Sequence, residues 1–131
     1  MTGVQTCALP IFFPLGPIGN LLTRNLTPDK ETGLGSWTDE QIRLAMQTGV
    51  DHHGKVLFPV MPYHVYNGMA DADVEAVIAY LHSVNAVKNE IPERTISTEG
   101  MQPLPFKTGT SAHDASDKAA RGAYLVNSVM G

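Results

Sequence analysis

The stretch Leu57-Phe-Pro-Val-Met-Pro-Tyr63 places Met61 between two prolines. Proline fixes φ and has no backbone N–H, so we predict that this stretch is a loop. The thioether of Met61 is a soft, neutral ligand that suits haem iron or Cu(I), and packing alone does not require a methionine in such a loop. Taken by itself, however, the stretch favours a methionine that only fills a hydrophobic core. The sequence of the neighbouring segments is needed to distinguish a metal ligand from a core residue.

A helix is predicted immediately before this loop, over residues 39–48. Thr38 can accept a hydrogen bond from the first turn, and Gln41, three residues later, completes the pattern of a capping box. Gly49 tolerates the left-handed conformation with which helices commonly end. The start and the end of this helix are therefore both marked in the sequence.

A second helix is predicted over 71–83 and a third over 117–129, with Ser116 as the N-cap of the third. The apolar stripe of the second helix consists of Val74, Val77, Ile78 and Leu81. Residues 12–35 are rich in proline and glycine and are expected to form a loop, and no segment has the alternation of a strand. The expected fold class is all-α, with three helices and long loops.

The composition excludes several classes of function. Nine lysines and arginines against 13 acidic residues give a net charge of −4, which disfavours a nucleic-acid partner. A single cysteine excludes an internal disulfide and an all-cysteine zinc site. The apolar run Ala8–Leu22 contains three prolines and is shorter than the ~18 residues of a membrane span, so no span is expected. No nucleophile or proton-shuttling group has a suitable neighbour, so the chain is not expected to be an enzyme.

Four motifs follow one another in a fixed order. They are Asn25-Leu-Thr-Pro-Asp29, Gly33-Leu-Gly-Ser-Trp-Thr-Asp39, Pro59-Val-Met-Pro-Tyr63 and Asp73-Val-Glu-Ala-Val-Ile-Ala-Tyr-Leu81. This series resembles the class I cytochrome c domain. It is most similar to the haem domains of multi-haem (or dihaem) cytochromes that serve membrane-bound dehydrogenases or respiratory chains, and the resemblance extends over about Phe12 to Pro92.

The resemblance implies electron transfer through a c-type haem, with haem c as the cofactor and Met61 as the distal axial ligand of its iron. The positions that it places around the haem are Asn25, Trp37, Leu57, Pro59, Pro62 and Tyr63. It implies a membrane-bound dehydrogenase or a terminal oxidase as the redox partner. It also implies a periplasmic location, free or at the membrane surface, because the family's haem is attached outside the cytoplasm.

The sequence departs from the family at the haem attachment site. The family binds haem through Cys-x-x-Cys-His, whose histidine is the proximal ligand, and the 131 residues do not contain this motif. We therefore interpret the chain as a fragment. Its expected parts are Met1–Ile11, which matches a translated sequencing-library adaptor, 12–92, the C-terminal part of a cytochrome c domain, 93–115, a linker, and 116–131, the first helix of a second, truncated cytochrome c domain.

The last predicted helix carries Gly122 and Tyr124, as does the N-terminal helix of the cytochrome c domains that it resembles. In this interpretation the first domain has lost its own N-terminal helix. We therefore expect the 117–129 helix to fold back and pack against the helix over 71–83.

Two other functions remain open. Met61 together with His52, His53 and His64 could form a copper-binding module. Alternatively, the chain could be an interaction domain that binds no metal, in which Met61 has a packing role only. Neither alternative requires the aromatic residues that accompany Met61 in the four motifs.

Overall fold

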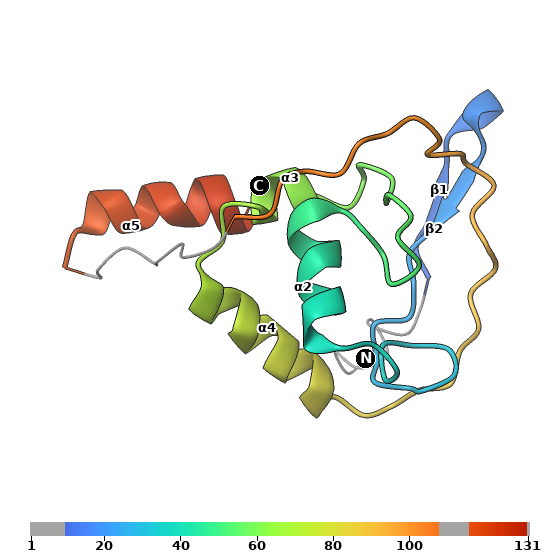
Figure 1. Ribbon diagram of the computed structural model, residues 1–131, viewed down its shortest axis with the longest axis horizontal. Coiled ribbons are helices and arrows are strands. Elements are labelled where there is room, and N and C mark those ends of the chain that lie inside the picture. Colours follow the sequence, from blue (N-terminus) through green and yellow to red (C-terminus); the bar gives the residue numbers. More distant parts are fainter. Residues whose placement is uncertain (1–9, 108–115, 131) are drawn as a thin grey trace. The chain divides into compact units, whose positions relative to one another are not determined.

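The computed structural model describes residues 10–107 and 116–130. The chain divides into two compact units, which we call the first unit (Met1–Trp37 and Ala79–Ser97) and the second unit (Thr38–Ile78 and Thr98–Gly131). Figure 1 traces the elements along the chain, from β1 in blue to α5 in red. Residues 1–9 of the expected adaptor segment and 108–115 of the expected linker lie outside the described residues.

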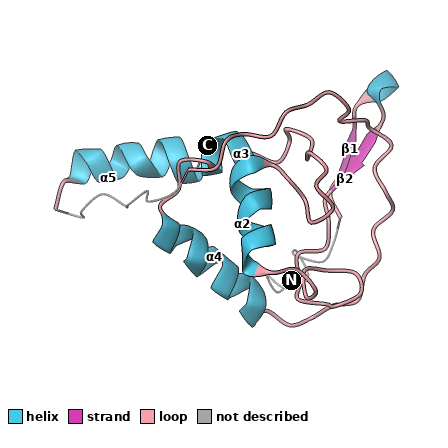
Figure 2. Cartoon of the chain, in the orientation of Figure 1, coloured by secondary structure: helices cyan, strands magenta, loops and turns pink. Residues whose placement is uncertain are grey.

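The first unit contains a β-hairpin that the sequence analysis missed. Strands β1 (Phe12–Pro14) and β2 (Asn20–Leu22) pair in antiparallel register, with the 3₁₀ turn η1 (Gly16–Ile18) between them. The prediction of a loop throughout 12–35 and the expectation of no strand are therefore wrong (Figure 2). The prolines obscured the signal, because proline cannot donate a ladder hydrogen bond and is confined to strand ends and edges. Pro14 is indeed the last residue of β1.

The hairpin is joined to a distant segment of the first unit through Thr95. The N–H of Asn20 donates to Thr95 Oγ1 at 2.8 Å, and the N–H of Thr95 donates to the carbonyl of Asn20 at 3.1 Å. Gly19 has a φ of +124°, and a Cβ built there would lie 2.9 Å from Thr95 Oγ1. Only glycine allows this close approach.

The second unit begins with α2 (Asp39–Thr48), which confirms the predicted helix at both ends. Thr38 Oγ1 accepts from the N–H of Gln41 at 3.2 Å, and Gln41 Oε1 accepts from the N–H of Thr38 at 2.9 Å, so the capping box is complete. Gly49 ends the helix with a φ of +77°. Local sequence signals fix both ends of this element.

A short helix, α3 (Tyr63–Tyr66), was not predicted, because its four residues are too few for a periodic pattern. α4 (Asp71–Ser83) confirms the second predicted helix at both ends. In the described residues none of the helices combines the length and the apolar character that a membrane crossing needs.

The third predicted helix is present as α5 (Lys118–Leu125), which continues as a π-helical turn, η2 (Val126–Met130). Asp117, not Ser116, is its N-cap: Asp117 Oδ1 accepts from the N–H of Ala120 at 3.0 Å. Both residue types cap helices well, so the sequence did not distinguish the two positions. The buried apolar residues of the second unit are Ile42, Met46, Tyr63, Met69, Ala70, Val74, Ile78 and Tyr124.

Candidate functional site

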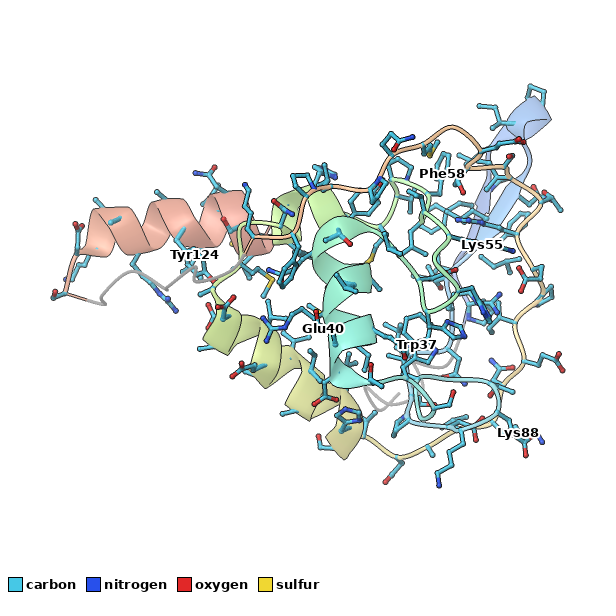
Figure 3. The ribbon with its side chains drawn as sticks, in the orientation of Figure 1. Trp37, Glu40, Lys55, Phe58, Lys88 and Tyr124 are labelled. Atoms are coloured by element: carbon cyan, nitrogen blue, oxygen red, sulfur yellow. The ribbon has the colours of Figure 1, made fainter. Side chains whose placement is uncertain are left out.

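Met61 lies in a tight turn of the second unit, directly before α3. Its N–H donates to the carbonyl of Phe58 at 3.0 Å, and its carbonyl accepts from the N–H of Tyr63 at 2.8 Å. The residue is half-buried. The backbone of Met61 is thus held by hydrogen bonds on both sides of the residue. Phe58 is labelled in Figure 3.

The loop before Met61 is attached to the end of α2. The N–H of Leu57 donates to the carbonyl of Gly49 at 2.7 Å, next to an isolated antiparallel bridge between Val50 and Val56. On the other side of Met61, the buried ring of Tyr63 packs against Gly49. Both branches of the loop therefore meet at the residue that ends α2.

Pro62 begins the α3 turn, and its carbonyl accepts from the N–H groups of Val65 at 3.0 Å and Tyr66 at 3.1 Å. Leu57 and Phe58 are half-buried, whereas Pro59 and Val60 are exposed. The loop thus combines a soft thioether with apolar neighbours and no ionised group. This donor set fits the distal side of a haem, and the predicted residues Leu57, Pro59, Met61, Pro62 and Tyr63 lie on the same loop.

Asn25, predicted beside the haem, is in the first unit and is only 2% exposed. Its Nδ2 donates to the carbonyl of Val87 at 2.8 Å and to Thr32 Oγ1 at 3.1 Å. Its Oδ1 accepts from the N–H of Thr27 at 3.0 Å and lies 2.8 Å from Thr27 Oγ1. The amide thus joins the loop after the hairpin to the segment after α4, and its role beside a haem stays a prediction.

Trp37 is also in the first unit, on the turn that precedes α2 (Figure 3). Its backbone N–H donates to the carbonyl of Leu34 at 2.9 Å, and the residue is half-buried. Its predicted position at the haem stays a prediction as well.

The histidines of the copper alternative do not gather. The rings of His52 and His53 lie with their centroids 3.8 Å apart on an exposed turn, and His64 is exposed on α3. Partial burial and the neighbouring His53 lower the pKa of His52, against the opposing effect of Asp51. Within the part of the chain that is described, no three His, Cys, Asp or Glu side chains are placed to hold a metal ion.

Two buried amides near the site were not predicted. Gln47 is 1% exposed and Asn67 is 5% exposed; Asn67 donates to the backbone carbonyl of Gln47, and Gln47 donates to that of Tyr66, next to Asn67. Gln47 is a polar residue, and hydrophobic periodicity gives no reason to expect it in the core. No sequence signal marks such a pair, because it depends on how α2 and α3 meet.

The C-terminal helix contacts the start of α4 within the second unit. The hydroxyl of Tyr124 accepts from the N–H of Ala70 at 2.9 Å and donates to the carboxylate of Asp73. Gly122 has nothing within 4 Å of a built Cβ. Tyr124, labelled in Figure 3, thus reaches the start of α4 through its hydroxyl, but among the described residues α5 and α4 have no extended packing, so the expected packing of the 117–129 helix against the 71–83 helix is wrong.

No protein-family model matches the chain. The chain is similar to the fructose dehydrogenase cytochrome subunit of Gluconobacter japonicus, with 33% identity over 128 residues. The match covers 85% of this chain and 25% of that protein. The cytochrome c subunit of the quinone-dependent alcohol dehydrogenase of Gluconobacter oxydans is 32% identical over 123 residues, 85% of this chain and 26% of that protein. The gluconate 2-dehydrogenase cytochrome c subunit of Pantoea cypripedii is 34% identical over 122 residues, and the match covers 84% of this chain and 28% of that protein.

The chain thus spans about a quarter of the length of these relatives. All three names describe cytochrome subunits of dehydrogenases. A similarity that extends over some 85% of this chain supports a cytochrome c-like domain.

Proposed function

We propose that the chain is part of an electron-transfer domain of the class I cytochrome c type, with Met61 as the distal axial ligand of a haem c. The observation that carries the proposal is the turn around Met61, a half-buried residue whose backbone is hydrogen-bonded on both sides. The similarity to cytochrome c subunits supports haem c as the cofactor. The helices would then belong to an all-α domain to which the short hairpin is an addition.

When bound, the haem supplies a one-electron couple whose potential a methionine ligand raises. The residues of this chain would orient the thioether and keep water away from it. Tyr63 and Leu57 anchor the two branches of the loop to Gly49, and Pro62 starts the turn that fixes the direction of Met61. Rigid ligation favours electron transfer, because little has to move when the charge changes.

The proximal half of such a site would come from outside these residues. Covalent attachment needs two cysteines and a histidine in Cys-x-x-Cys-His, and the 131 residues contain one cysteine. We propose that a longer protein supplies this motif and that 116–131 is the first helix of a second domain of the same kind.

In this function the chain is an electron carrier and does not itself catalyse a reaction. The names of the relatives support a dehydrogenase as the redox partner, with a terminal oxidase as the other candidate. A location on the periplasmic side of the membrane follows from the family resemblance alone.

The proposal can be tested with a haem peptide that carries its own Cys-x-x-Cys-His and leaves one axial position of the iron free. Added to the full chain, the peptide should acquire the absorption spectrum of iron with a methionine ligand. Met61→Ala should abolish this change, whereas Met130→Ala, which alters a methionine that is 76% exposed, should not.

Three outcomes would contradict the proposal. If Met61→Ala leaves the spectral change intact, the ligand is another residue. If no change occurs and Cu(I) instead binds in a manner that His52→Ala abolishes, the copper-binding module is the better explanation. If neither the haem peptide nor Cu(I) binds, an interaction domain that binds no metal is the better explanation.

A further inference from the structure

Two side-chain amides join the segment after Met61 to the end of α2. Asn67 Nδ2 donates to the carbonyl of Gln47 at 2.7 Å. In the other direction, Gln47 Nε2 donates to the carbonyl of Tyr66 at 3.2 Å and reaches that of Met69 at 3.4 Å. Asn67 thus binds the backbone of Gln47, and Gln47 binds the backbone on either side of Asn67. We call this pair of side chains the amide clamp.

The amide clamp also reaches the segment that follows residue 98. Asn67 Nδ2 donates to the carbonyl of Pro105 at 3.1 Å, and the N–H of Leu104 donates to the carbonyl of Thr48 at 3.0 Å. Three stretches of the second unit are therefore joined at the side chain of Asn67. Because this side chain is buried, water does not compete for its hydrogen bonds.

A short, internally bonded turn connects the clamp to Met61. The carbonyl of Met61 accepts from Tyr63, and the N–H of Asn67 donates to the carbonyl of Tyr63 at 2.9 Å. The residues between them form α3. A displacement of Asn67 would therefore pass to Met61 through a turn that has little freedom to absorb it.

Gln47 has a feature that stability alone does not explain. Its Oε1 is buried and has no hydrogen-bond partner among the described residues. Burying an acceptor without a donor is unfavourable, and an apolar side chain of similar size would avoid it. A buried acceptor without a donor is expected where a residue serves the function of a protein and not the stability of its fold.

We propose that Gln47 and Asn67 are positioning residues for Met61. Through the carbonyls of α3 and α2 they hold in one place the loop of residues 57–63, which we call the ligand loop. The part of this inference that concerns iron rests on the function proposed above. The part that concerns the loop rests on the amide clamp itself.

The test compares Gln47→Leu with Gln102→Leu in the full chain, since Gln102 is exposed and gives the same substitution as a control. The measurement is the rate at which dilute peroxide oxidises each methionine, read by peptide mapping, together with thermal unfolding. Oxidation of Met46, which is buried, measures global opening of the fold. Oxidation of the exposed Met130 measures the reactivity of the peroxide itself.

In Gln47→Leu, Met61 should be oxidised about fivefold faster, the factor by which the net loss of one hydrogen bond changes a local opening equilibrium. Oxidation of Met46 and Met130 should not change. The melting temperature should change little, because removal of an unpaired buried acceptor offsets the loss of the donor to Tyr66 and Met69. A residue with a merely structural role would instead lower the melting temperature and expose Met46 and Met61 together.

Asn67→Leu provides a second variant. It leaves the carbonyls of Gln47 and Pro105 without this donor, so Met61 should become more reactive while the melting temperature falls. An unchanged rate at Met61 in both variants would overturn the inference, as would an increase at Met46 that parallels the one at Met61 in Gln47→Leu. The assay contains no haem, so a selective effect at Met61 combined with no binding of the haem peptide would refute the proposed function and leave the positioning role standing.

Discussion

The ring of Tyr63 lies against the backbone of Gly49, so close that a Cβ built on the glycine would be 2.8 Å from both Cδ1 and Cε1. Gly49 also has a φ of +77°, which residues with a side chain rarely adopt. One residue thus ends α2 and leaves space for the aromatic ring that follows Met61 and Pro62. The position of the ligand loop depends on the absence of a side chain at residue 49.

Gly49→Ala is therefore expected to destabilise the second unit by about 2–5 kcal/mol, the sum of the left-handed conformation and the overpacking of the ring. The measurement is the free energy of unfolding by denaturant. Gly54→Ala is the control, because Gly54 has a φ of +79° and nothing within 4 Å of its built Cβ. It should cost only the conformational part, about 1–2 kcal/mol. Equal costs at the two positions would mean that the contact with Tyr63 is not tight.

A pH-dependent contribution to stability is expected from Tyr124. Burial raises the pKa of its hydroxyl above the ordinary value of 10.0, and donation to Asp73 raises it further. The neutral hydroxyl is thus the form that the fold favours, so its contribution is complete below pH 10 and is lost as the pH rises through the higher pKa of the folded state.

Tyr124→Phe should accordingly lower the free energy of unfolding by about 1–2 kcal/mol at neutral pH, because it leaves the N–H of Ala70 without its acceptor. The difference between the wild type and the variant should shrink above pH 10. Denaturant unfolding followed from pH 7 to 11 checks both statements, and a difference that stays constant to the alkaline end would contradict the assignment.

The contact between Gly68 and Ser128 offers a test of how η2 sits on the second unit. A Cβ at Gly68 would lie 2.7 Å from Ser128 Oγ and 3.4 Å from Ser128 Cβ. Gly68→Ala alone should therefore destabilise by about 1 kcal/mol, because the hydroxyl has to move. In a Ser128→Ala background the same substitution should stabilise by roughly 0.4–1 kcal/mol, since alanine restricts the unfolded chain. The same sign in both backgrounds would argue against this contact.

The elements that were predicted correctly carry their own signals. The capping box of Thr38 and Gln41 and the stop at Gly49 are local, so α2 was predicted to the residue. The elements that were missed depend on distant partners. The hairpin is held by Thr95, which lies 75 residues after Asn20, and the sequence of the 12–22 stretch does not predict this contact.

The candidate site divides in the same way. Met61 could be proposed as a ligand because three further motifs accompany its loop in a fixed order, whereas the loop alone favours a methionine that only fills the core. The amide clamp could not, because Gln47 and Asn67 are ordinary polar residues until α3 is placed against the end of α2. Sequence motifs can therefore point to a candidate ligand, whereas the contacts of Gln47 and Asn67 become visible only with the fold.

Asn25 allows the predicted haem contact and the observed structural role to be separated. Its amide bonds to Val87 and Thr32, which hold the first unit together without any cofactor. Asn25→Ala should therefore destabilise the haem-free chain by about 3 kcal/mol, as expected when a buried hydrogen-bond network loses its centre. Asn85→Ala, at an exposed position of the same unit, should have an effect within about 0.5 kcal/mol. A small effect of Asn25→Ala on haem-free unfolding, combined with a large effect on binding of the haem peptide, would instead favour the role beside the haem.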